Sequence, residues 1–139
     1  MSYSAERASI EQRWATQWVT GSPSAARTPT AYENVPYEPI EGTSWVRITI
    51  LNGEGRQLSM GDVGNNTHRY AGVIALQIFT PAGAGSDAGK ELADLAAAVF
   101  RNQRFDSIYC RVPYISGTSI EGQWHQTNIN VPFWRDEYQ

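Results

Sequence analysis

Two glycines ahead of a helix-like segment form the most specific chemical motif of the sequence. Gly83-Ala84-Gly85-Ser86-Asp87-Ala88 fits the G-x-G-x-x-G/A pattern that places a dinucleotide pyrophosphate on a helix N-terminus, and Asp106 follows near the spacing of a ribose-binding acid. In such sheets the ligand lies beyond the carboxyl ends of parallel strands. Asp106 is expected at the start of its strand, on the opposite edge from the glycines. A turn that leads into a capped helix therefore explains the motif better than a nucleotide site.

The other reactive side chains form no recognisable catalytic or metal-binding set. The segment Gly117 to Gly122 lacks the G-x-S-x-G spacing of a nucleophile elbow. His68 and His125 are far apart in sequence and have no neighbours with metal-ligand spacing, and the carboxylates are scattered. Cys110 lies in a strand-like run and is expected to be a small core residue. We therefore expect a protein that is not an enzyme and that uses no cofactor and no metal.

Composition narrows the classes of partner. The chain has 139 residues and a net charge of −3, and 18% of its residues are charged. The acidic balance argues against a protein that grips nucleic acid by its phosphates, which requires a basic stripe. A low share of charged residues fits a chain that buries surface against copies of itself. The start lacks the apolar segment of a signal peptide and no apolar run could span a membrane, so we expect a protein made in a cytoplasm without membrane contact.

Apolar periodicity predicts two helices. In residues 4–19 the side chains of Ile10, Trp14 and Trp18 recur every four residues and form one buried stripe, with Ser4 as the N-cap. The opposite, charged face of this helix carries Glu6, Arg7, Glu11 and Arg13. The second helix begins at Ser86 or Asp87 and runs to about Asn102, again with an apolar stripe.

Alternating residues predict the strands. Residues 69–80 are apolar on both faces, which predicts a central strand that is covered on both sides. Further strands are expected at 44–52, weakly at 56–60, at 107–114 and at 123–133, with a turn at 116–122 and a polar tail at 134–139. The order helix, strands, helix, strands predicts an α+β fold: a single mostly antiparallel sheet with two main helices packed on it.

Two irregular segments interrupt this single domain of residues 1–139. Residues 21–44 are proline-rich and are expected to form an extended arm, with Pro23 helping to end the first helix and an edge strand near Ala31 to Val35. The arm could lie along its own domain or along a neighbouring subunit. Residues 53–68 are rich in glycine and asparagine and are expected to form a flexible loop.

Several stretches together resemble a known family. They are Glu11-Gln12-Arg13-Trp14, Ala31 to Tyr37, Trp45-Val46-Arg47, Arg69 to Ile74, and Gln77 to Gly83, followed by Gly85 and an alanine-rich helix that leads to Phe100 and Phe105. The chain is similar to small phage and prophage proteins of the siphophage tail terminator type. The resemblance spans nearly the whole chain, and its motifs are structural rather than catalytic.

The resemblance implies a structural virion protein located in the tail or neck. Tail terminators form a hexameric ring that caps the tail tube, ends tube polymerisation and offers an attachment surface to head-side neck proteins. The implied partners are copies of the same chain, the tail tube protein and a head–tail connector or neck protein. DNA would pass through the lumen without specific binding, and assembly would take place in the host bacterial cytoplasm.

Four residues are expected at an interface. Arg56, His68 and Arg69 lie in or beside the loop at 53–68, and loops carry recognition. Trp134 lies near the end of the chain, and large aromatic residues are enriched at subunit interfaces. The alternatives are another neck role, either head–tail joining or head closure, a small nucleotide-binding enzyme built on the glycine turn, and a monomeric binding module.

Overall fold

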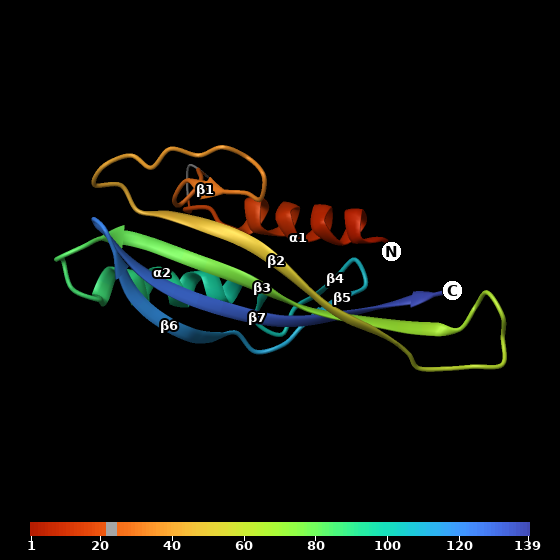
Figure 1. The fold of residues 1–139 in the computed structure, drawn as a ribbon. Coiled ribbons are helices and arrows are strands. Elements are labelled where there is room, and N and C mark those ends of the chain that lie inside the picture. Colours follow the sequence, from red (N-terminus) through yellow and green to blue (C-terminus); the bar gives the residue numbers. More distant parts are fainter. Residues whose placement is uncertain (22–24) are drawn as a thin grey trace.

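A sheet with two helices dominates the computed structural model, which describes residues 1–21 and 25–139 (Figure 1). The elements are α1 (Tyr3–Gln17), β1 (Thr30–Ala31), β2 (Trp45–Gln57), β3 (Thr67–Pro81), α2 (Asp87–Phe100), β4 (Arg104–Phe105), β5 (Ile108–Cys110), β6 (Tyr114–Glu121) and β7 (Trp124–Tyr138). The expected single, mostly antiparallel sheet with two helices is present. Strand residues outweigh helical ones, 44% against 21%, so α+β is a coarse description of a sheet-dominated fold.

The sheet is built around the two longest strands. Its order is β1-β2-β3-β7-β5-β4, and β6 also pairs with β7. Strands β3 and β7 are antiparallel and pair from Thr67 and Tyr138 at one end to Pro81 and Trp124 at the other. The expected polar tail at 134–139 is wrong, because β7 continues to Tyr138. The period-2 alternation of inward and outward side chains simply persists past Pro132.

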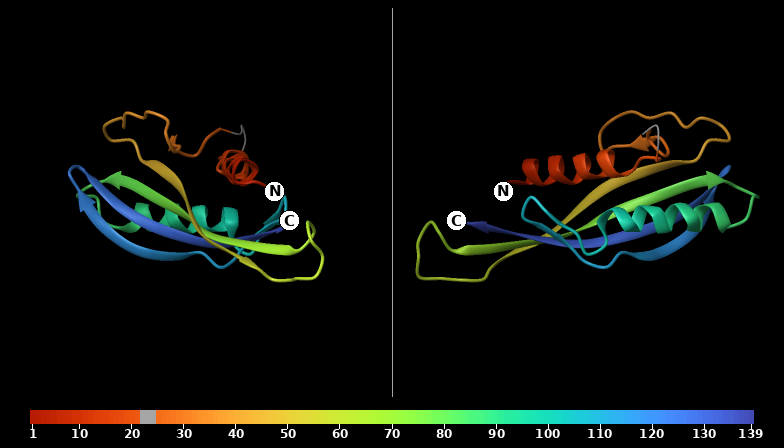
Figure 2. Two further views of the ribbon diagram at one scale, coloured as in Figure 1. Left: turned by 45° about the vertical axis from the view of Figure 1, so that its right-hand side comes forward. Right: turned by 180° about the vertical axis from the view of Figure 1, so that it is seen from behind.

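Both helices pack on one face of the sheet. Figure 2 shows α2 in front of β3 and β7 when the molecule is seen from behind, with α1 running beside β2. Trp14 of α1 stacks on Trp18 at 4.5 Å and on Phe100 of α2 at 6.1 Å between ring centroids, so the helices share one core with the inward residues of the sheet. The predicted apolar stripe of α1 is confirmed. That of α2 is confirmed for Ala96, Val99 and Phe100, whereas Leu95, which the sequence pattern also places in the buried stripe, is 41% exposed.

The opposite face of β3 is only partly covered, which corrects the expectation that both faces are buried. Phe79 is buried there because Trp45 stacks on it at 4.0 Å and the arm residue Tyr37 packs against the same pair. Farther along the strand, Val73 and Ala75 are half-exposed and no helix lies over them. The outer face therefore presents a mixed apolar and polar surface over the middle of the sheet.

The start of α1 lies earlier than the sequence predicted. Ser2 is the N-cap, and its hydroxyl accepts a hydrogen bond from the backbone N–H of Ala5 at 3.1 Å. Ser4, expected to be the cap, is helical. Glu6, placed on the charged outer face by the sequence analysis, is instead buried, with 2% of its surface exposed. A buried carboxylate requires a partner, and the last strand supplies it.

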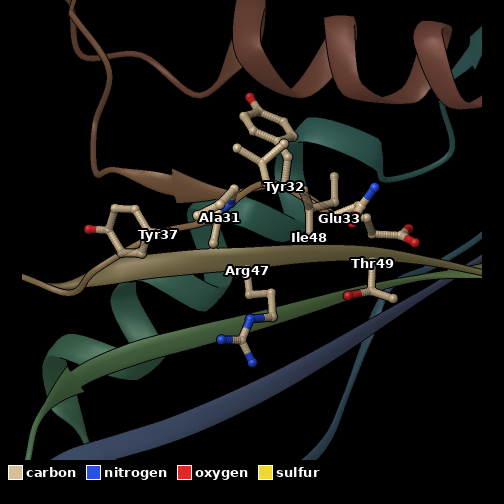
Figure 3. Close-up of a pocket in the computed structure, with 10 residues that line it drawn as sticks. Ala31, Tyr32, Glu33, Tyr37, Arg47, Ile48 and Thr49 are labelled. Atoms are coloured by element: carbon tan, nitrogen blue, oxygen red, sulfur yellow. The ribbon is translucent and has the colours of Figure 1, made fainter.

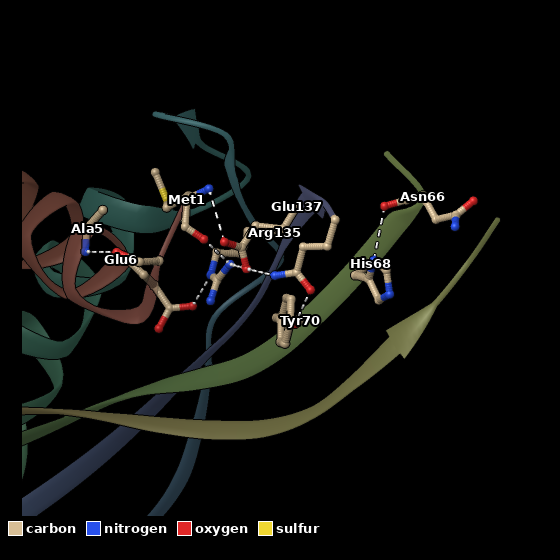
Figure 4. Close-up of polar contacts among 10 residues, drawn as sticks. Met1, Ala5, Glu6, Asn66, His68, Tyr70, Arg135 and Glu137 are labelled. Carbon is tan, nitrogen blue, oxygen red and sulfur yellow. Dashed lines mark hydrogen bonds and ion pairs between the residues drawn. The ribbon is translucent and has the colours of Figure 1, made fainter. Parts of the chain in front are cut away.

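A buried arginine joins the first helix to the last strand (Figure 4). Arg135 is fully buried and donates to Glu6 Oε1 at 2.7 Å, to Glu137 Oε2 at 2.8 Å and to the carbonyl oxygen of Met1 at 2.6 Å. The N-terminal ammonium lies 3.4 Å from Glu137 Oε1. The ring of Tyr70 lies 4.6 Å from the guanidinium carbon. This polar cluster fixes the N-terminus of α1 against β7.

Glu137 makes the stability of the protein depend on acid pH. Burial alone would raise the pKa of this carboxyl, but hydrogen bonding and the charge of Arg135, together with the N-terminal ammonium, outweigh burial and hold the pKa below its ordinary value of 4.5. The ionised form is therefore favoured by folding. We expect this contribution to be fully present above pH 4.5 and to be lost as pH falls through the lower, folded-state pKa.

The measurement is urea unfolding at a series of pH values between neutrality and acid, for the wild type and for Glu137→Gln. The difference in free energy of unfolding between the two proteins should shrink as the pH falls below the ordinary range of glutamate. A difference that stays constant through that range would contradict the assignment.

The loop between β2 and β3 is shorter than expected. Strand β2 continues to Gln57 and β3 begins at Thr67, so the loop predicted at 53–68 spans only residues 58–66. The expected weak strand at 56–60 overlaps the end of β2, and a register shift at Asn52 to Gly55 absorbs the extra residues of that strand. The glycines at 53 and 55 thus belong to a strand that bends rather than to a loop.

The arm lies along its own domain where the structure describes it. The edge strand is Thr30–Ala31 rather than 31–35, and it pairs in parallel with Val46 and Arg47 of β2. Beyond it, Glu33 accepts a hydrogen bond from the backbone N–H of Ile50 at 2.6 Å, which occupies a free donor on the edge of β2. The expected helix stop at Pro23 lies outside the described residues.

The strand expected at 107–114 is divided in two. Strand β5 ends at Cys110, and β6 begins at Tyr114 and occupies most of the predicted turn at 116–122. Pro113 separates them, since proline cannot donate a ladder hydrogen bond. Cys110 is buried as expected, and burial raises the pKa of its thiol to about 12. This thiol is therefore protonated at neutral pH and shielded from reagents.

Candidate subunit interface

Three of the four residues expected at an interface lie on the same face of the sheet. Arg56 of β2 is the cross-strand partner of Arg69 of β3, and Arg69 is the partner of Asp136 of β7. Trp134 lies two residues before Asp136, and alternate residues of a strand share a face. This is the outer face, away from the helices. This part of the outer face lies at the end of the sheet from which the β2–β3 hairpin projects (Figure 1).

Aromatic and cationic side chains stack across this end of the outer face. We call Arg69, Trp134, Tyr109 and Arg104 the outer stack. The guanidinium carbon of Arg69 lies 3.8 Å from the Trp134 ring centroid, the Trp134 and Tyr109 rings stack at 4.0 Å, and the Arg104 guanidinium carbon lies 4.5 Å from the Tyr109 ring. Contacts of this kind between partly exposed groups are worth about 0.5–1.5 kcal/mol each. They hold large flat side chains in one orientation while leaving them reachable from solvent.

The charges of this face are incompletely paired. Arg69 binds Asp136 through two hydrogen bonds, at 2.8 and 3.1 Å, and this bonding raises the pKa of Arg69. Arg56 stands directly opposite Arg69 and forms no ion pair within residues 1–21 and 25–139. Like charges opposite one another repel, so an acidic group from a partner would relieve this pair. Arg56 is the group most available for such a contact.

His68 does not belong with these residues. It is the cross-strand partner of Glu137. Glu137 lies two positions after the buried Arg135 and therefore on the helix side of the sheet, so His68 faces away from Arg69. Its Nδ1 lies 3.0 Å from the carbonyl oxygen of Asn66, a local contact at the base of the loop (Figure 4). A position adjacent in sequence thus lies on the opposite face, because successive side chains of a strand alternate.

Comparison with known families decides what kind of protein carries this surface. The model of the phage tail terminator protein family matches residues 7–133. The chain belongs to this family. It is a structural protein family rather than an enzyme family, and its members are components of the phage tail.

Relatives outside the family model add only the fold. No curated protein matches the sequence. A solved structure that is 19% identical superposes with a TM-score of 0.70, and the match covers 100% of this chain and 98% of the other. The family member described here therefore shares its whole fold with a protein of distant sequence.

Sequence reasoning missed three residues that complete the surface of this tail terminator family member. Tyr109 and Arg104 come from the short strands β5 and β4, and Asp136 comes from the part of β7 that was expected to be a tail. The signal for Asp136 was present, because Pro132, Trp134 and Asp136 alternate with Phe133 and Arg135. Tyr109 and Arg104 could not be found, since only the pairing of β5 with β7 brings them beside Trp134.

The glycine motif is a turn in this family member. Gly83 and Gly85 have φ angles of 87° and 85°, a left-handed conformation that glycine adopts without strain, and they connect β3 to α2. Both neighbours of β3 are antiparallel to it, so the parallel β-α-β unit of a dinucleotide site is not built here. Asp106 lies in the turn between β4 and β5 rather than at the start of a strand. The nucleotide-binding alternative loses its geometric basis.

A hollow of the surface lies elsewhere, beneath the arm (Figure 3). It has a volume of about 390 Å³ and lies between residues 31–37 of the arm and residues 47–49 of β2. Its acid, Glu33, already bonds the backbone of Ile50. Within the described part of the chain no group of three or more His, Cys, Asp or Glu side chains could hold a metal ion. The hollow is a gap left where the arm turns away from the sheet edge.

No helix of the described residues is long and apolar enough to cross a membrane.

Proposed function

We propose that this protein forms a ring of six copies that caps the phage tail tube, ends tube polymerisation and provides the attachment surface for head-side neck proteins. The match to the tail terminator family over residues 7–133 carries this proposal. The protein would act in the tail or neck of the virion and would assemble in the cytoplasm of the host bacterium.

The shape of the subunit supports assembly by head-to-tail contacts. The β2–β3 hairpin and the outer stack lie at one end of the sheet, and α2 and β6 lie toward the other (Figure 1). Two chemically different surfaces on one subunit permit a heterologous contact that repeats from copy to copy, and such a contact closes into a ring when the rotation fits. A chain with one self-complementary patch would stop at a dimer.

The charge of the chain supports a lumen that lets DNA pass. The net charge is −3, so a ring of these subunits carries no overall attraction for phosphates. DNA leaving the capsid would move through the ring without specific binding. The tail tube protein on one side and a connector or neck protein on the other are the proposed partners.

The decisive experiment measures both the mass of the protein's assemblies in solution and the length of tail tubes. The mass of the purified protein is measured across a concentration series, and any large species is imaged by negative stain. Tail tubes assembled in a phage that lacks the protein are then measured with and without added wild-type protein. The proposal expects closed rings and tubes of fixed length only when the protein is present. Tubes of unchanged length in its absence would reject tube termination.

Charge reversal at Arg56 tests the outer face. We expect Arg56→Glu to reduce tail completion at least about tenfold, because the variant replaces a cation that forms no ion pair in the described chain with an anion that repels an acidic partner. Arg7→Glu makes the same change of charge on α1, where the side chain is 56% exposed, and serves as the control. Tail completion is scored as infectious particles. Normal completion by Arg56→Glu would remove Arg56 from the interface.

The alternative is another neck role, either head–tail joining or head closure. Such proteins also form rings, so ring formation alone does not separate the roles. The partner separates them: a terminator binds the end of the tube, whereas a head closure protein binds the connector of the capsid. Pull-down of purified tube protein and purified connector by the purified ring distinguishes the two.

A further inference from the structure

The loop between β2 and β3 displays apolar side chains to solvent. Val63 and Met60 are 98% and 88% exposed, and Leu58 at the base of the same loop is 44% exposed. Exposed apolar side chains that cluster on a projecting segment mark interaction sites. The loop lies beyond the end of the sheet, away from the helices (Figure 2). The side chains of Met60 and Val63 are therefore left almost entirely to solvent.

Hydrogen bonds hold the loop in a defined conformation. Asn66 and Gln139 exchange two backbone hydrogen bonds of 2.9 Å, which tie the loop to the end of the chain. Asn65 donates to the carboxylate of Asp62 at 3.2 Å, and the backbone N–H of Asp62 donates to the side chain of Asn66 at 3.2 Å. These bonds hold the loop in a conformation in which Met60 and Val63 stay exposed.

A second part of the molecule offers a matching recess. A groove of about 90 Å³ lies between α2 and the start of β6. Its apolar lining is Ala93, Ala97, Pro113, Tyr114, Ile115 and Ile129. The volume is about three times the roughly 30 Å³ share of one water in the liquid, which suits one apolar side chain rather than a folded ligand. We call this recess the α2–β6 groove.

The charges of the two features are complementary. Asp62 is the one ionisable residue of the loop at 58–66, and it lies between Met60 and Val63 in sequence. Arg101 lines the α2–β6 groove, is exposed, and takes part in none of the ion pairs of the described chain. An apolar side chain seated in the groove would therefore bring an acid toward an unpaired cation. Asp94 also lines the groove and would repel an acid, so the contact requires Asp62 to lie on the Arg101 side of the groove.

The loop cannot occupy the groove of its own subunit. The loop joins β3 at Thr67, whereas Tyr114 at the groove lies level with Ala75 of β3 through Asn130. Eight residues of strand separate the two levels, which is roughly 26 Å at about 3.3 Å per residue. The occupant must come from another molecule, and a second copy of this chain supplies a loop of the right size and charge.

We propose that the β2–β3 loop of one subunit docks into the α2–β6 groove of the next, with Met60 or Val63 in the groove and Asp62 beside Arg101. The contact is heterologous, because loop and groove are different surfaces, and it repeats around a ring. This inference rests on the proposed function, for which it names the residues that join neighbouring subunits.

A charge exchange tests the pairing of Asp62 with Arg101. Asp62→Arg and Arg101→Asp should each raise the protein concentration needed for half-assembly by at least about tenfold, and the double variant should return most of the loss. Glu41→Arg, a charge reversal at an exposed position of the arm, should leave assembly unchanged. The readout is sedimentation velocity, with circular dichroism as a check that each variant is folded. Single variants that assemble like the wild type overturn the inference.

A covalent test locates the contact directly. Under a mild oxidant, Val63→Cys combined with Ile115→Cys should give a series of disulfide-linked oligomers on a denaturing gel, whereas neither single variant should extend beyond a dimer. Cys110 is buried and does not interfere. Wild-type oligomers without such a series overturn the inference and leave ring formation standing.

A wild type that stays monomeric at every concentration also overturns the inference, since the contact is between copies of this chain. In that case the measurement of tail tube length still tests the proposed function.

Discussion

Arg135→Ala is expected to lower the free energy of unfolding by about 3–5 kcal/mol. The side chain is fully buried, and its removal leaves the carboxylate of Glu6, 2% exposed, without its cation. Glu137 and the carbonyl of Met1 lose the same donor. A buried ion left unpaired keeps the desolvation cost of folding and loses the attraction that offset it. Because domains are stable by only about 5–15 kcal/mol, this single change removes a large share of the total.

Two variants separate the buried charge from lost packing. In Glu6→Gln/Arg135→Met both members of the pair are neutral, and we expect this protein to recover much of the loss. Arg69→Ala is the matched control, since Arg69 also binds a carboxylate and an aromatic ring but is 37% exposed. Arg69→Ala should lower the free energy of unfolding by about 1 kcal/mol or less through loss of the ion pair, and further by loss of the aromatic contact. Urea unfolding followed by circular dichroism measures all three. Equal losses for Arg135→Ala and Arg69→Ala would contradict the argument.

Trp14→Ala is expected to cost about 3–5 kcal/mol for a different reason. Trp14 is fully buried and stacks on Trp18 and Phe100, so the change opens a cavity where α1 meets α2. Its indole N–H also donates to Thr30 Oγ1 at 3.0 Å. The same substitution therefore loosens the short strand β1 at the edge of the sheet. Thermal and urea unfolding measure the loss.

Trp134→Ala is the control for Trp14→Ala. It removes an equally large ring, but from the half-exposed outer stack, where it contacts Tyr109 and Arg69. We expect a loss of about 1–2 kcal/mol in stability. A loss as large as that of Trp14→Ala would show that the outer face is part of the core. A small loss with impaired assembly would assign Trp134 to the interface.

Local pattern was sufficient for the parts of the fold that depend on one segment at a time. The stripe of Ile10, Trp14 and Trp18 and the alternation of β3 were readable because a helix and a strand impose periods on their buried residues. The boundaries were less secure. Ser2 rather than Ser4 caps α1, and β2 runs through Gly53 and Gly55. The second error comes from the pairing of β2 with β3, which overrides the local preference of glycine for a loop.

The residues expected at an interface also divide into those that local pattern indicates and those that only the folded sheet places. Trp134 was predicted from its residue type and Arg69 from its place beside the predicted loop, and the structure places the two side chains in contact. Their contact with another subunit stays a prediction. His68, also expected at an interface, belongs to β3 rather than to a loop and faces the opposite side of the sheet from Arg69, because successive residues of a strand alternate between faces. Its role at an interface stays a prediction. The buried state of Glu6 and Arg135 was not readable at all. They are more than a hundred positions apart in sequence, and only the assembled sheet and helix bring them together.

The long pairing of β3 with β7 has a consequence for the timing of synthesis. These strands join residues 67 and 138 at one end and 81 and 124 at the other, so the centre of the sheet is made of contacts distant in sequence. Such contacts form slowly, because a long loop of chain must be ordered before they stabilise anything. On the ribosome, β3 must wait with one edge unpaired until the last strand emerges. The same strand brings Trp134 and Asp136, so a truncated chain lacks both its central partner and the outer stack. A chain that stops before β7 therefore cannot present the surface proposed for assembly.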